Sequence, residues 1–461
     1  MAKPSLPQGT RDFSAEVVRK RNFILSTIKN VFEVYGFEPL ETPAMENLDT
    51  LIGKYGEEGD KLMYKILNNG ISNPKNIEKS KAGFEKVLEG KSSSDLTERA
   101  LKYDLTIPFA RYVAMNHGRL TFPYRRFQIQ PVWRGDSPQK GRYREFTQCD
   151  ADVVGSYSLI NEVELASIYN DVFAKLGIKG YELRVNSRKI LTALAEVCGE
   201  AGKVVAITTA IDKLDKIGID RVKEELRSKD LTDDQVALIE SYLTMNNAAG
   251  ETTNTDKLKF LKDFFSDSSE GKKGIEELEF ITSGVSSDIN IIIDVTLARG
   301  LNYYTGIIFE AKAPAAIKIG SIGGGGRYDD LTGLFGVPGI PGVGISFGVD
   351  RIYDVMTEMN LFPEDVAGGT KVLFFNMGES ESHFAFGIMQ QLRHTGVSCE
   401  LYHETVKINK QFNYAEKKNI GYAIIIGSKE IEQKYCLVKD LKTGLQEVVI
   451  FDKLAEFFQN K

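Results

Sequence analysis

Two segments of the sequence, 124–133 and 145–154, alternate in the manner of β-strands, and a loop with glycines and a proline joins them. Two such segments joined by turn residues predict an antiparallel hairpin. Arg134, Arg142 and Arg144 lie at or near the two strand ends, where fork-shaped guanidinium groups can converge on phosphate oxygens. The fold therefore has to accommodate a sheet with a long basic hairpin loop. An ordinary solvated loop is the alternative explanation of these arginines and stays open at this point.

The second of these segments has two different faces. Side chains alternate between the faces of a strand, so Phe146, Gln148, Asp150 and Asp152 share one face, and small or apolar residues occupy the other. Gln148 and Asp152 are about 13 Å apart at about 3.3 Å per residue, enough to bracket a small polar molecule. A carboxylate there needs a cationic or hydrogen-bonding partner. Pairing of Asp152 with a structural arginine is the alternative to a ligand-binding role.

Length and composition limit the remaining possibilities. The 461 residues favour two or three domains, and 42% hydrophobic with 26% charged residues is typical of a water-soluble globular chain. A net charge of −6 argues against a polybasic binder and leaves room for a local basic site. The four cysteines are scattered singly, which fits neither a disulfide framework nor a zinc site and favours a reducing cytoplasm. Without a signal-peptide pattern or a long apolar run, we expect neither export nor membrane insertion.

Periodicity divides the first two thirds of the chain into segments. The three-and-four spacing of apolar residues predicts an amphipathic helix over 14–35. The polar segment 65–95 predicts a partly mobile surface excursion with a weak helical patch at 84–88. From about 188 to 285, Lys, Glu, Asp and Leu recur at helical spacing, broken by a polar stretch at 246–256, which predicts an inserted helical domain.

Strand character returns towards the C-terminal end, at 289–295, 306–311 and 342–347. Four consecutive glycines at 323–326 lack the Lys-Ser/Thr of a phosphate-binding loop. They predict that the backbone runs close to a ligand or to a neighbouring strand, and both remain open. The last ninety or so residues alternate strands with helices and predict a separate compact α/β unit after a linker at 361–370, with a β-rich end.

Several clusters, taken in order, resemble the class II aminoacyl-tRNA synthetases. Residues 36–43 resemble motif 1, the dimer-forming helix and strand of that class. Residues 134–148, which contain the basic hairpin loop, resemble motif 2. Residues 342–351, a strand that runs into a helix with Arg351 in its first turn, resemble motif 3. These three motifs indicate the class without indicating the amino acid.

Further clusters resemble the histidyl-tRNA synthetase family in particular. Residues 299–304, Arg-Gly-Leu-Asn-Tyr-Tyr, and residues 324–329, Gly-Gly-Gly-Arg-Tyr-Asp, are similar to its two histidine-specific signatures. Residues 104–106, Asp-Leu-Thr, are similar to its amino-acid-binding triplet, and residues 407–415 followed by Gly427 to its anticodon-binding domain. The similarity covers nearly the whole chain.

The resemblance implies a fold and its domains. The fold would be α/β, with the class II antiparallel sheet flanked by helices, an inserted helical domain and a C-terminal α/β anticodon-binding domain. Residues 1–187 and 286–360 would form the two parts of the catalytic domain, 188–285 the inserted helical domain and 370–461 the anticodon-binding domain.

The resemblance also implies roles for individual side chains at the matched positions. Histidine would be held by Asp104, Leu105, Thr106, Gln148, Asp152, Tyr303 and Tyr304, the carboxylates meeting its amino group and the polar side chains its imidazole. ATP would be held by Arg134, Asp136, Arg142, Phe146 and Arg351. Arg134 would grip the α-phosphate and Arg299 would face it from the opposite side, where other class II enzymes place a metal, so both are expected catalytic residues. No metal ligands are assigned, and Mg²⁺ would arrive bound to ATP.

Members of this family join histidine to ATP and then transfer the histidyl group from the adenylate to tRNA(His). The resemblance therefore implies a cytoplasmic homodimer without membrane association, whose partners are ATP, L-histidine and tRNA(His). Gln411, Phe412 and Tyr414 would meet splayed anticodon bases. The alternative is a non-catalytic regulatory subunit of histidine biosynthesis. Such relatives usually lose the anticodon-binding domain and several ATP-binding arginines, which this sequence retains.

Overall fold

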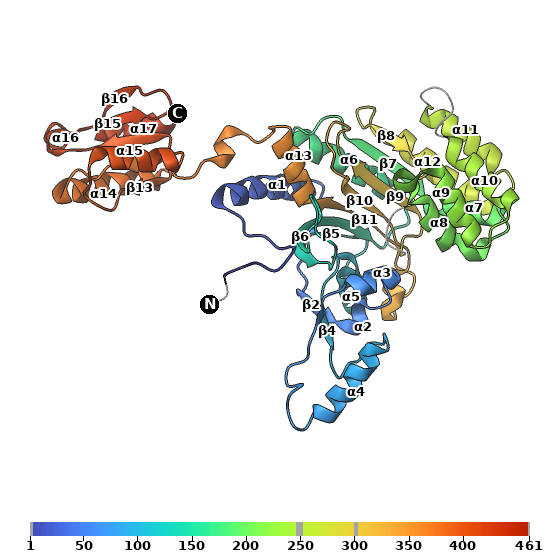
Figure 1. The fold of residues 1–461 in the computed structure, drawn as a ribbon. Coiled ribbons are helices and arrows are strands. Elements are labelled where there is room, and N and C mark those ends of the chain that lie inside the picture. The colour runs from blue at the N-terminus through green and yellow to red at the C-terminus, as the bar shows by residue number, and fades with distance from the viewer. Residues whose placement is uncertain (1–2, 246–251, 299–302, 460–461) are drawn as a thin grey trace. The chain divides into compact units, whose positions relative to one another are not determined.

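The computed structural model describes residues 3–245, 252–298 and 303–459 (Figure 1). They form two compact units, each described by itself. The first contains Met1–Arg11 and Phe23–Leu361, and the second contains Asp12–Asn22 and Phe362–Lys461. The division after Leu361 falls at the start of the linker expected from the sequence.

An eight-stranded sheet in the order β1-β5-β6-β11-β10-β9-β7-β8 forms the centre of the first unit. Its strands are β1 (Glu38–Pro39), β5 (Tyr124–Trp133), β6 (Glu145–Val154), β7 (Glu182–Ser187), β8 (Ile291–Ile293), β9 (Ile307–Lys312), β10 (Ser321–Arg327) and β11 (Gly342–Gly348). The pairs from β5 to β7 are antiparallel, and β1 and β8 add parallel edges. The predicted hairpin is confirmed with the same bounds, and Asp152 lies opposite Arg126.

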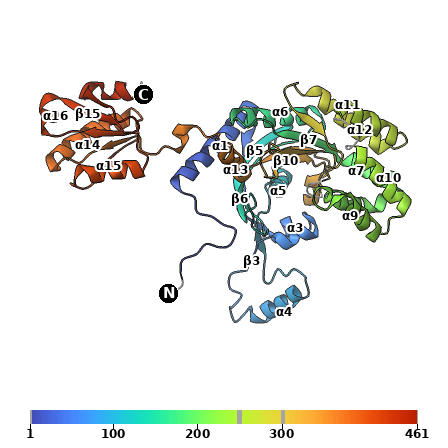
Figure 2. The same ribbon diagram turned by 45° about the horizontal axis from the view of Figure 1, so that its top comes forward.

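Helices cover the apolar face of this sheet. They are the second half of α1 (Ala15–Val34), α6 (Ile160–Lys175) and α13 (Val349–Glu358), which lie along the sheet in Figures 1 and 2. The ring of Phe32 on α1 lies 5.7 Å from that of Phe127 and 5.9 Å from that of Phe347. The helix predicted over 14–35 is confirmed within one residue at each end. Since the apolar side chains of β6 face this layer, its polar side chains are left for the opposite face.

The four glycines lie inside β10, paired between β9 and β11. A Cβ atom at Gly325 would come within 2.2 Å of the carbonyl oxygen of Gly344 on β11. Glycine is required there because two backbones approach more closely than any side chain allows. The close approach to a neighbouring strand is therefore confirmed, and Gly323 and Gly324 also line the cavity described below.

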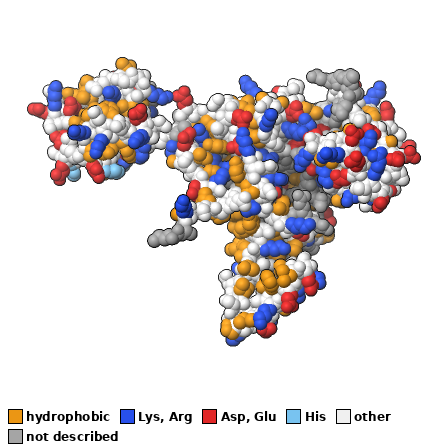
Figure 3. Space-filling view, viewed as in Figure 1, with side chains coloured by type: hydrophobic (Ala, Val, Ile, Leu, Met, Phe, Trp, Pro, Cys, Tyr) orange, Lys and Arg blue, Asp and Glu red, His pale blue; other side chains and the backbone are white. Residues whose placement is uncertain are grey.

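The polar segment at 65–95 holds a longer helix than its sequence predicts. A small sheet in the order β2-β4-β3 adjoins it: β2 (Met45–Asn47) precedes the segment, β3 (Lys65–Ile66) begins it and β4 (Arg99–Leu101) follows it. The helix α4 spans Ile77–Leu88, because residues of good helix propensity extend the predicted patch. Phe84 is 56% and Leu88 72% exposed. In Figure 3, hydrophobic side chains (orange) are gathered on the part of the surface that contains α4.

The stretch expected to be helical contains α7 (Arg188–Val197), α8 (Val204–Ile211), α9 (Leu214–Ser228), α10 (Asp233–Thr244), α11 (Asn254–Phe264) and α12 (Ser269–Gly284). It belongs to the same compact unit as the large sheet, since α12 packs against both α7 and β7. Of the polar stretch at 246–256, residues 246–251 lie outside the described residues. Its last residues begin α11, which Thr253 caps with its side chain.

The second unit is a five-stranded sheet in the order β13-β12-β14-β15-β16 with helices packed on it. Its elements are β12 (Val372–Phe374), α14 (Glu379–His394), β13 (Cys399–Leu401), α15 (Ile408–Lys417), β14 (Tyr422–Ile425), α16 (Ser428–Gln433), β15 (Tyr435–Asp440), β16 (Gln446–Ile450) and α17 (Leu454–Gln459). The end expected to be rich in strands also holds α16 and α17, and Leu454 and Phe458 of α17 are buried in the core. The α/β fold class expected from the sequence is confirmed.

The expectation that Gln411 meets an anticodon base is wrong. Gln411 is fully buried, where its Oε1 accepts from the backbone N–H of Asn376 at 2.8 Å and its Nε2 donates to the carbonyl of Val406 at 3.2 Å. It therefore fixes two loops of the second unit. Phe412 and Tyr414 remain partly exposed.

Candidate functional site

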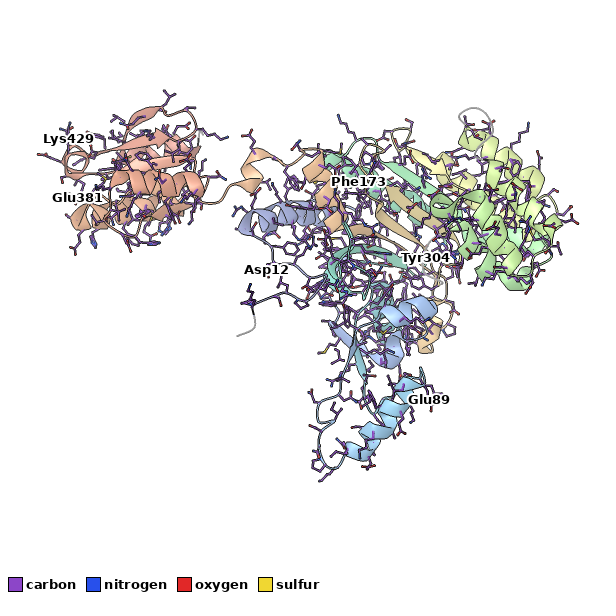
Figure 4. The ribbon with its side chains drawn as sticks, viewed as in Figure 1. Asp12, Glu89, Phe173, Tyr304, Glu381 and Lys429 are labelled. Carbon is purple, nitrogen blue, oxygen red and sulfur yellow. The ribbon has the colours of Figure 1, made fainter. Side chains whose placement is uncertain are left out.

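A cavity of about 340 Å³ lies on the polar face of the large sheet, and Tyr304, labelled in Figure 4, is part of its wall. The expected site residues that line it are Asp104, Thr106, Arg134, Asp136, Arg142, Phe146, Gln148, Asp152, Tyr303, Tyr304 and Arg351. Leu105 does not line it: its side chain is buried and its carbonyl accepts from Arg126 at 3.3 Å. Arg299 lies outside the described residues. The strand β6 contributes side chains to both ends of the cavity.

Asp104 is held in place at one end by three donors. Its Oδ1 accepts from the hydroxyl of Tyr55 at 2.8 Å and from the backbone N–H of Ile107 at 3.2 Å, and its Oδ2 accepts from the hydroxyl of Tyr303 at 3.2 Å. The N–H belongs to the first turn of α5 (Thr106–Asn116), which favours a negative charge. Burial nevertheless raises the pKa of Asp104, while these hydrogen bonds oppose the shift. Thr106 stands beside it and bonds Tyr303.

Asp152 has a buried cation and a tyrosine as partners. Its Oδ2 lies 2.9 Å from Nη2 of Arg126, which is fully buried with its guanidinium 4.3 Å from the centre of the Phe109 ring. The hydroxyl of Tyr328 donates to Oδ1 of Asp152. Burial raises the pKa of Asp152, and Arg126 is the largest influence that opposes this shift. The structural arginine considered from the sequence is therefore present, and Asp152 still lines the cavity.

Tyrosines form the wall beside the carboxylates. The rings of Tyr303 and Tyr304 meet edge to face with centres 5.0 Å apart, and Tyr303 meets Tyr328 in the same way at 6.1 Å. Burial raises the pKa of all three hydroxyls, so each stays neutral and keeps a proton to donate. This end of the cavity therefore offers carboxylates and hydroxyls around flat apolar surfaces, which suits a small planar molecule with N–H groups.

The opposite end of the cavity is basic. Arg134 donates from Nε to the carbonyl of Tyr103 at 3.0 Å, and its guanidinium carbon lies 4.3 Å from the centre of the Tyr103 ring and 5.2 Å from that of Phe146. Because Nε is bonded within the protein, the guanidinium plane is fixed and its terminal nitrogens are left to meet an anion.

The basic loop is tied to the start of α13. Arg351 donates from Nε to the carbonyl of Gly141 at 2.8 Å and from Nη1 to the carbonyl of Ser321 at 2.6 Å. Arg142, half exposed, lies 3.7 Å from Asp136. Arg351 is therefore fixed beside the cavity, whereas the Arg142 side chain is held only by its ion pair with Asp136 among the described residues. A cation at the first turn of a helix becomes favourable when an anion binds beside it.

The N-terminal segment supports the other side of the same loop. Arg11 pairs with Asp350, and its guanidinium lies 3.2 Å from the centre of the Tyr143 ring. The backbone N–H of Arg144 donates to the carbonyl of Gly9 at 2.9 Å. Arg144, predicted to converge on phosphate, also donates from Nε to the carbonyl of Asp136 at 3.1 Å, so it holds the loop in shape.

Several cavity residues have no role in the sequence prediction. Asp150, 3% exposed, lines the cavity between Gln148 and Asp152, and strand alternation already places it on their face. Tyr328 belongs to the second histidine-specific signature, residues 324–329. Its hydrogen bond to a carboxylate on another strand could not be predicted from the neighbouring sequence. Ser346 and Glu310 depend on the pairing of β11 and β9 with their neighbours, which no local pattern reveals. In the described part of the chain, no group of three or more His, Cys, Asp or Glu side chains is placed to hold a metal ion.

An antiparallel sheet with this cavity, carboxylates and tyrosines at one end and arginines with an aromatic ring at the other, defines a class II aminoacyl-tRNA synthetase. A family model described as "Histidyl-tRNA synthetase" matches residues 86–352, and one described as "Anticodon binding domain" matches residues 371–461. The chain belongs to the histidyl-tRNA synthetase family.

Relatives along the full length agree with this assignment. The chain is 50% identical to the histidine–tRNA ligase of Flavobacterium johnsoniae over 99% of both chains, and 50% identical to that of Bacteroides fragilis over 98% of both. The crystal structure of the histidyl-tRNA synthetase from Nostoc sp. matches with a TM-score of 0.82 at 31% identity over 100% of both chains. Among the described residues, no helix is both long and apolar enough to cross a membrane.

Proposed function

We propose that this protein is a histidine–tRNA ligase, which forms histidyl-adenylate from histidine and ATP and then transfers the histidyl group to the terminal ribose of tRNA(His). One observation carries the proposal: a single cavity joins an end suited to a planar N–H-bearing side chain to an end suited to phosphate, in a chain of this family. The full-length ligase relatives do not favour the alternative of a regulatory subunit.

The order of side chains along β6 suggests how the substrates lie. Phe146 stands at the basic end, Gln148 follows, and Asp152 lies deepest. The reacting carboxylate of histidine has to meet the α-phosphate near Arg134. Its α-amino group, one carbon away, then falls near Gln148 and Asp104, and the imidazole extends towards Asp152. This arrangement differs from the expectation from the sequence, which placed both carboxylates, Asp104 and Asp152, at the amino group and Gln148 at the imidazole.

The imidazole end explains the choice of amino acid. In this proposal a ring N–H donates to Asp152, whose other contacts with Arg126 and Tyr328 hold it in place, and Tyr303 and Tyr304 pack beside the ring. An aliphatic side chain of similar size would offer Asp152 no hydrogen bond of its own and would place apolar carbon against a buried carboxylate. Sites that hydrogen-bond their substrate reject such analogues strongly.

Adenylate formation in this site needs alignment and charge neutralisation more than proton transfer. A carboxylate oxygen of histidine bonds to the α-phosphorus while the bond from that phosphorus to the bridging oxygen breaks, and pyrophosphate leaves with the electron pair. Arg134 would stabilise the charge on the α-phosphate, and Arg299 would act from the opposite side. Arg142 would hold the outer phosphates, with Phe146 and Arg351 on the two faces of adenine.

Magnesium would enter as part of the substrate, bound to the phosphates of ATP. Mg²⁺ prefers phosphate oxygens together with one or two carboxylates. Glu310, 6% exposed on the cavity wall, offers such a carboxylate and accepts a hydrogen bond from Ser321. Asp136, also on the cavity wall, would keep the basic loop oriented through its ion pair with Arg142.

The remaining partners follow from the family. The second unit would bind the anticodon loop of tRNA(His), with the partly exposed Phe412 and Tyr414 available for stacking. Residues 36–43 would form the interface of a homodimer, because β1 is an edge strand of the large sheet. Light scattering at twice the 51.4 kDa mass of one chain would support the dimer. The reaction would take place in the cytoplasm.

The decisive measurement is pyrophosphate exchange into ATP with each amino acid in turn. We expect exchange only with histidine and magnesium present. Equal exchange with threonine or proline would contradict the amino-acid assignment, and no exchange with any amino acid would favour the regulatory subunit.

A further inference from the structure

A chain of hydrogen bonds runs from Gln148 to β11 and back to β6. The Nε2 of Gln148 donates to the hydroxyl oxygen of Ser346 at 3.1 Å. The hydroxyl of Ser346 in turn bonds to the carboxyl group of Asp150. Ser346 lies directly opposite Asp150 in the pairing of the two strands, so all three side chains share the cavity face.

The chemistry of these groups gives the chain a direction. Above its raised pKa of about 7, the carboxylate of Asp150 can only accept, so at pH 8 Ser346 has to donate its single proton to Asp150. The hydroxyl oxygen of Ser346 is then available to Gln148 only as an acceptor. Gln148 therefore has to turn its NH₂ group towards Ser346, and its carbonyl oxygen has to point the other way.

The free end of the hydrogen-bond chain is the amide oxygen of a residue that lines the cavity. Oε1 of Gln148 is buried and makes no hydrogen bond among the described residues, although Gln148 lines the cavity. A buried amide oxygen without a donor costs free energy unless a ligand supplies one. The α-amino group of an amino acid is a donor only, so it fits this oxygen and would be repelled by an NH₂ group in the same place.

We propose that Asp150 and Ser346 are positioning residues that fix the direction of the Gln148 amide, so that its oxygen receives the α-amino group of histidine. The inference rests on the proposed function and deepens it. Without Asp150, the hydroxyl of Ser346 can donate to Gln148, and the amide can turn over and present its NH₂ group to the substrate. Neither side chain needs to touch the amino group to decide how well it binds.

The test measures histidine-dependent pyrophosphate exchange at pH 8 in full-length Ser346→Ala and Asp150→Ala variants. We expect the KM for histidine to rise about 10-fold in each, the scale of one hydrogen bond to a charged group, with a smaller change in kcat. Ser346→Thr keeps the hydroxyl and should restore the KM to within about two-fold. Ser283→Ala is the matched control, because Ser283 is exposed and bonds only carbonyls of its own helix, α12.

A second ligand separates positioning from a general loss of structure. Imidazolepropionate lacks the α-amino group, so its inhibition constant should change by less than about two-fold in Ser346→Ala. In a Gln148→Ala background, Ser346→Ala should add less than about two-fold to the KM for histidine, since the effect passes through Gln148.

The outcomes distinguish this inference from the proposed function. Equal weakening of histidine and imidazolepropionate, or an unchanged KM for histidine in both variants, would overturn the positioning role. Absence of histidine-dependent exchange in the unsubstituted protein would instead overturn the proposed function itself.

Discussion

Arg327 is 3% exposed on β10, and its guanidinium makes a two-bond contact with Glu162 of α6. Nε lies 2.6 Å from Oε1 and Nη2 lies 2.9 Å from Oε2, and Glu162 is fully buried. The pair fixes a helix to the strand that carries the second histidine signature. Removing Glu162 would leave the buried guanidinium with only Asp329 at 3.3 Å and the carbonyl of Ser156 at 3.2 Å among its partners in the described part of the chain, which are weaker compensation for its charge.

We therefore expect Glu162→Ala to lower the free energy of unfolding by about 3 kcal/mol. The matched control is Glu164→Ala two residues away, since Glu164 is 36% exposed and pairs with Arg125 at 3.0 Å. That change should cost less than about 1 kcal/mol, as exposed ion pairs do. Denaturant unfolding of both variants gives the comparison, and similar losses would contradict the argument.

A second residue-scale prediction concerns stability and pH. Burial raises the pKa of Asp150 from 3.8 to about 7, opposed by Arg126 and assisted by Asp152 and Asp104. Its stabilising contribution is complete below about pH 4 and is lost as the pH rises through 7, because the unfolded carboxyl ionises first. Asp150→Asn does not titrate, so its Tm relative to the unsubstituted protein should be higher at pH 8 than at pH 5. A pH-independent difference in calorimetric scans would show that Asp150 ionises normally.

At the scale of elements, β10 shows how tightly the sheet is packed. A Cβ atom at Gly325 would lie 2.2 Å from the carbonyl oxygen of Gly344, whereas one at Gly324 would meet the carbonyl oxygen of Phe309 at 3.5 Å, an ordinary contact. Gly325→Ala should push β10 and β11 apart and lower the free energy of unfolding by about 1–3 kcal/mol. Gly324→Ala should cost clearly less. Thermal unfolding of the two variants tests this difference. Equal stability would show that the sheet shifts to make room for the added methyl group at Gly325.

Elements whose residue types alternate along the chain were predictable. The bounds of β6 follow from such period-two alternation, because its small or apolar side chains face the helices and its polar side chains line the cavity. The helix α17 is too short for its pattern to be recognised, and burial of Leu454 and Phe458 in tertiary structure stabilises it.

The site was predictable where one strand carries it. Alternation along β6 assembles Phe146, Gln148 and Asp152 on one face, and the cavity contains all three. Ser346 and Tyr328 reach the same cavity through pairings between strands far apart in the sequence, and local patterns hold no information on such pairings. The prediction for Gln411 failed in the opposite direction: it was expected to meet a ligand and is buried instead. A polar side chain on a helix can satisfy its hydrogen bonds in the core.

For the whole molecule, we predict that removal of the residues after Thr370 separates the two steps of the reaction. The described cavity residues all precede Phe362, so histidine-dependent pyrophosphate exchange should persist, while charging of tRNA should fall sharply. The cut is placed after Thr370, and not after Leu361, so that Phe362 is kept. Its ring centre lies 5.3 Å from Nζ of Lys20 on α1. Truncated protein that charges tRNA at the full-length rate would show that the second unit does not read the anticodon.

The two ends of the cavity share β6, and this has a mechanical consequence. Many enzymes with two substrates bring them together by closing a hinge between two bodies. In this protein the distance from Phe146 to Asp152 is set by the backbone of one central strand, whose neighbours on both sides resist stretching. In the proposed arrangement this strand therefore fixes the spacing of the two substrates, and an amino acid whose side chain is too long or too short would not place its carboxylate in line with the α-phosphate.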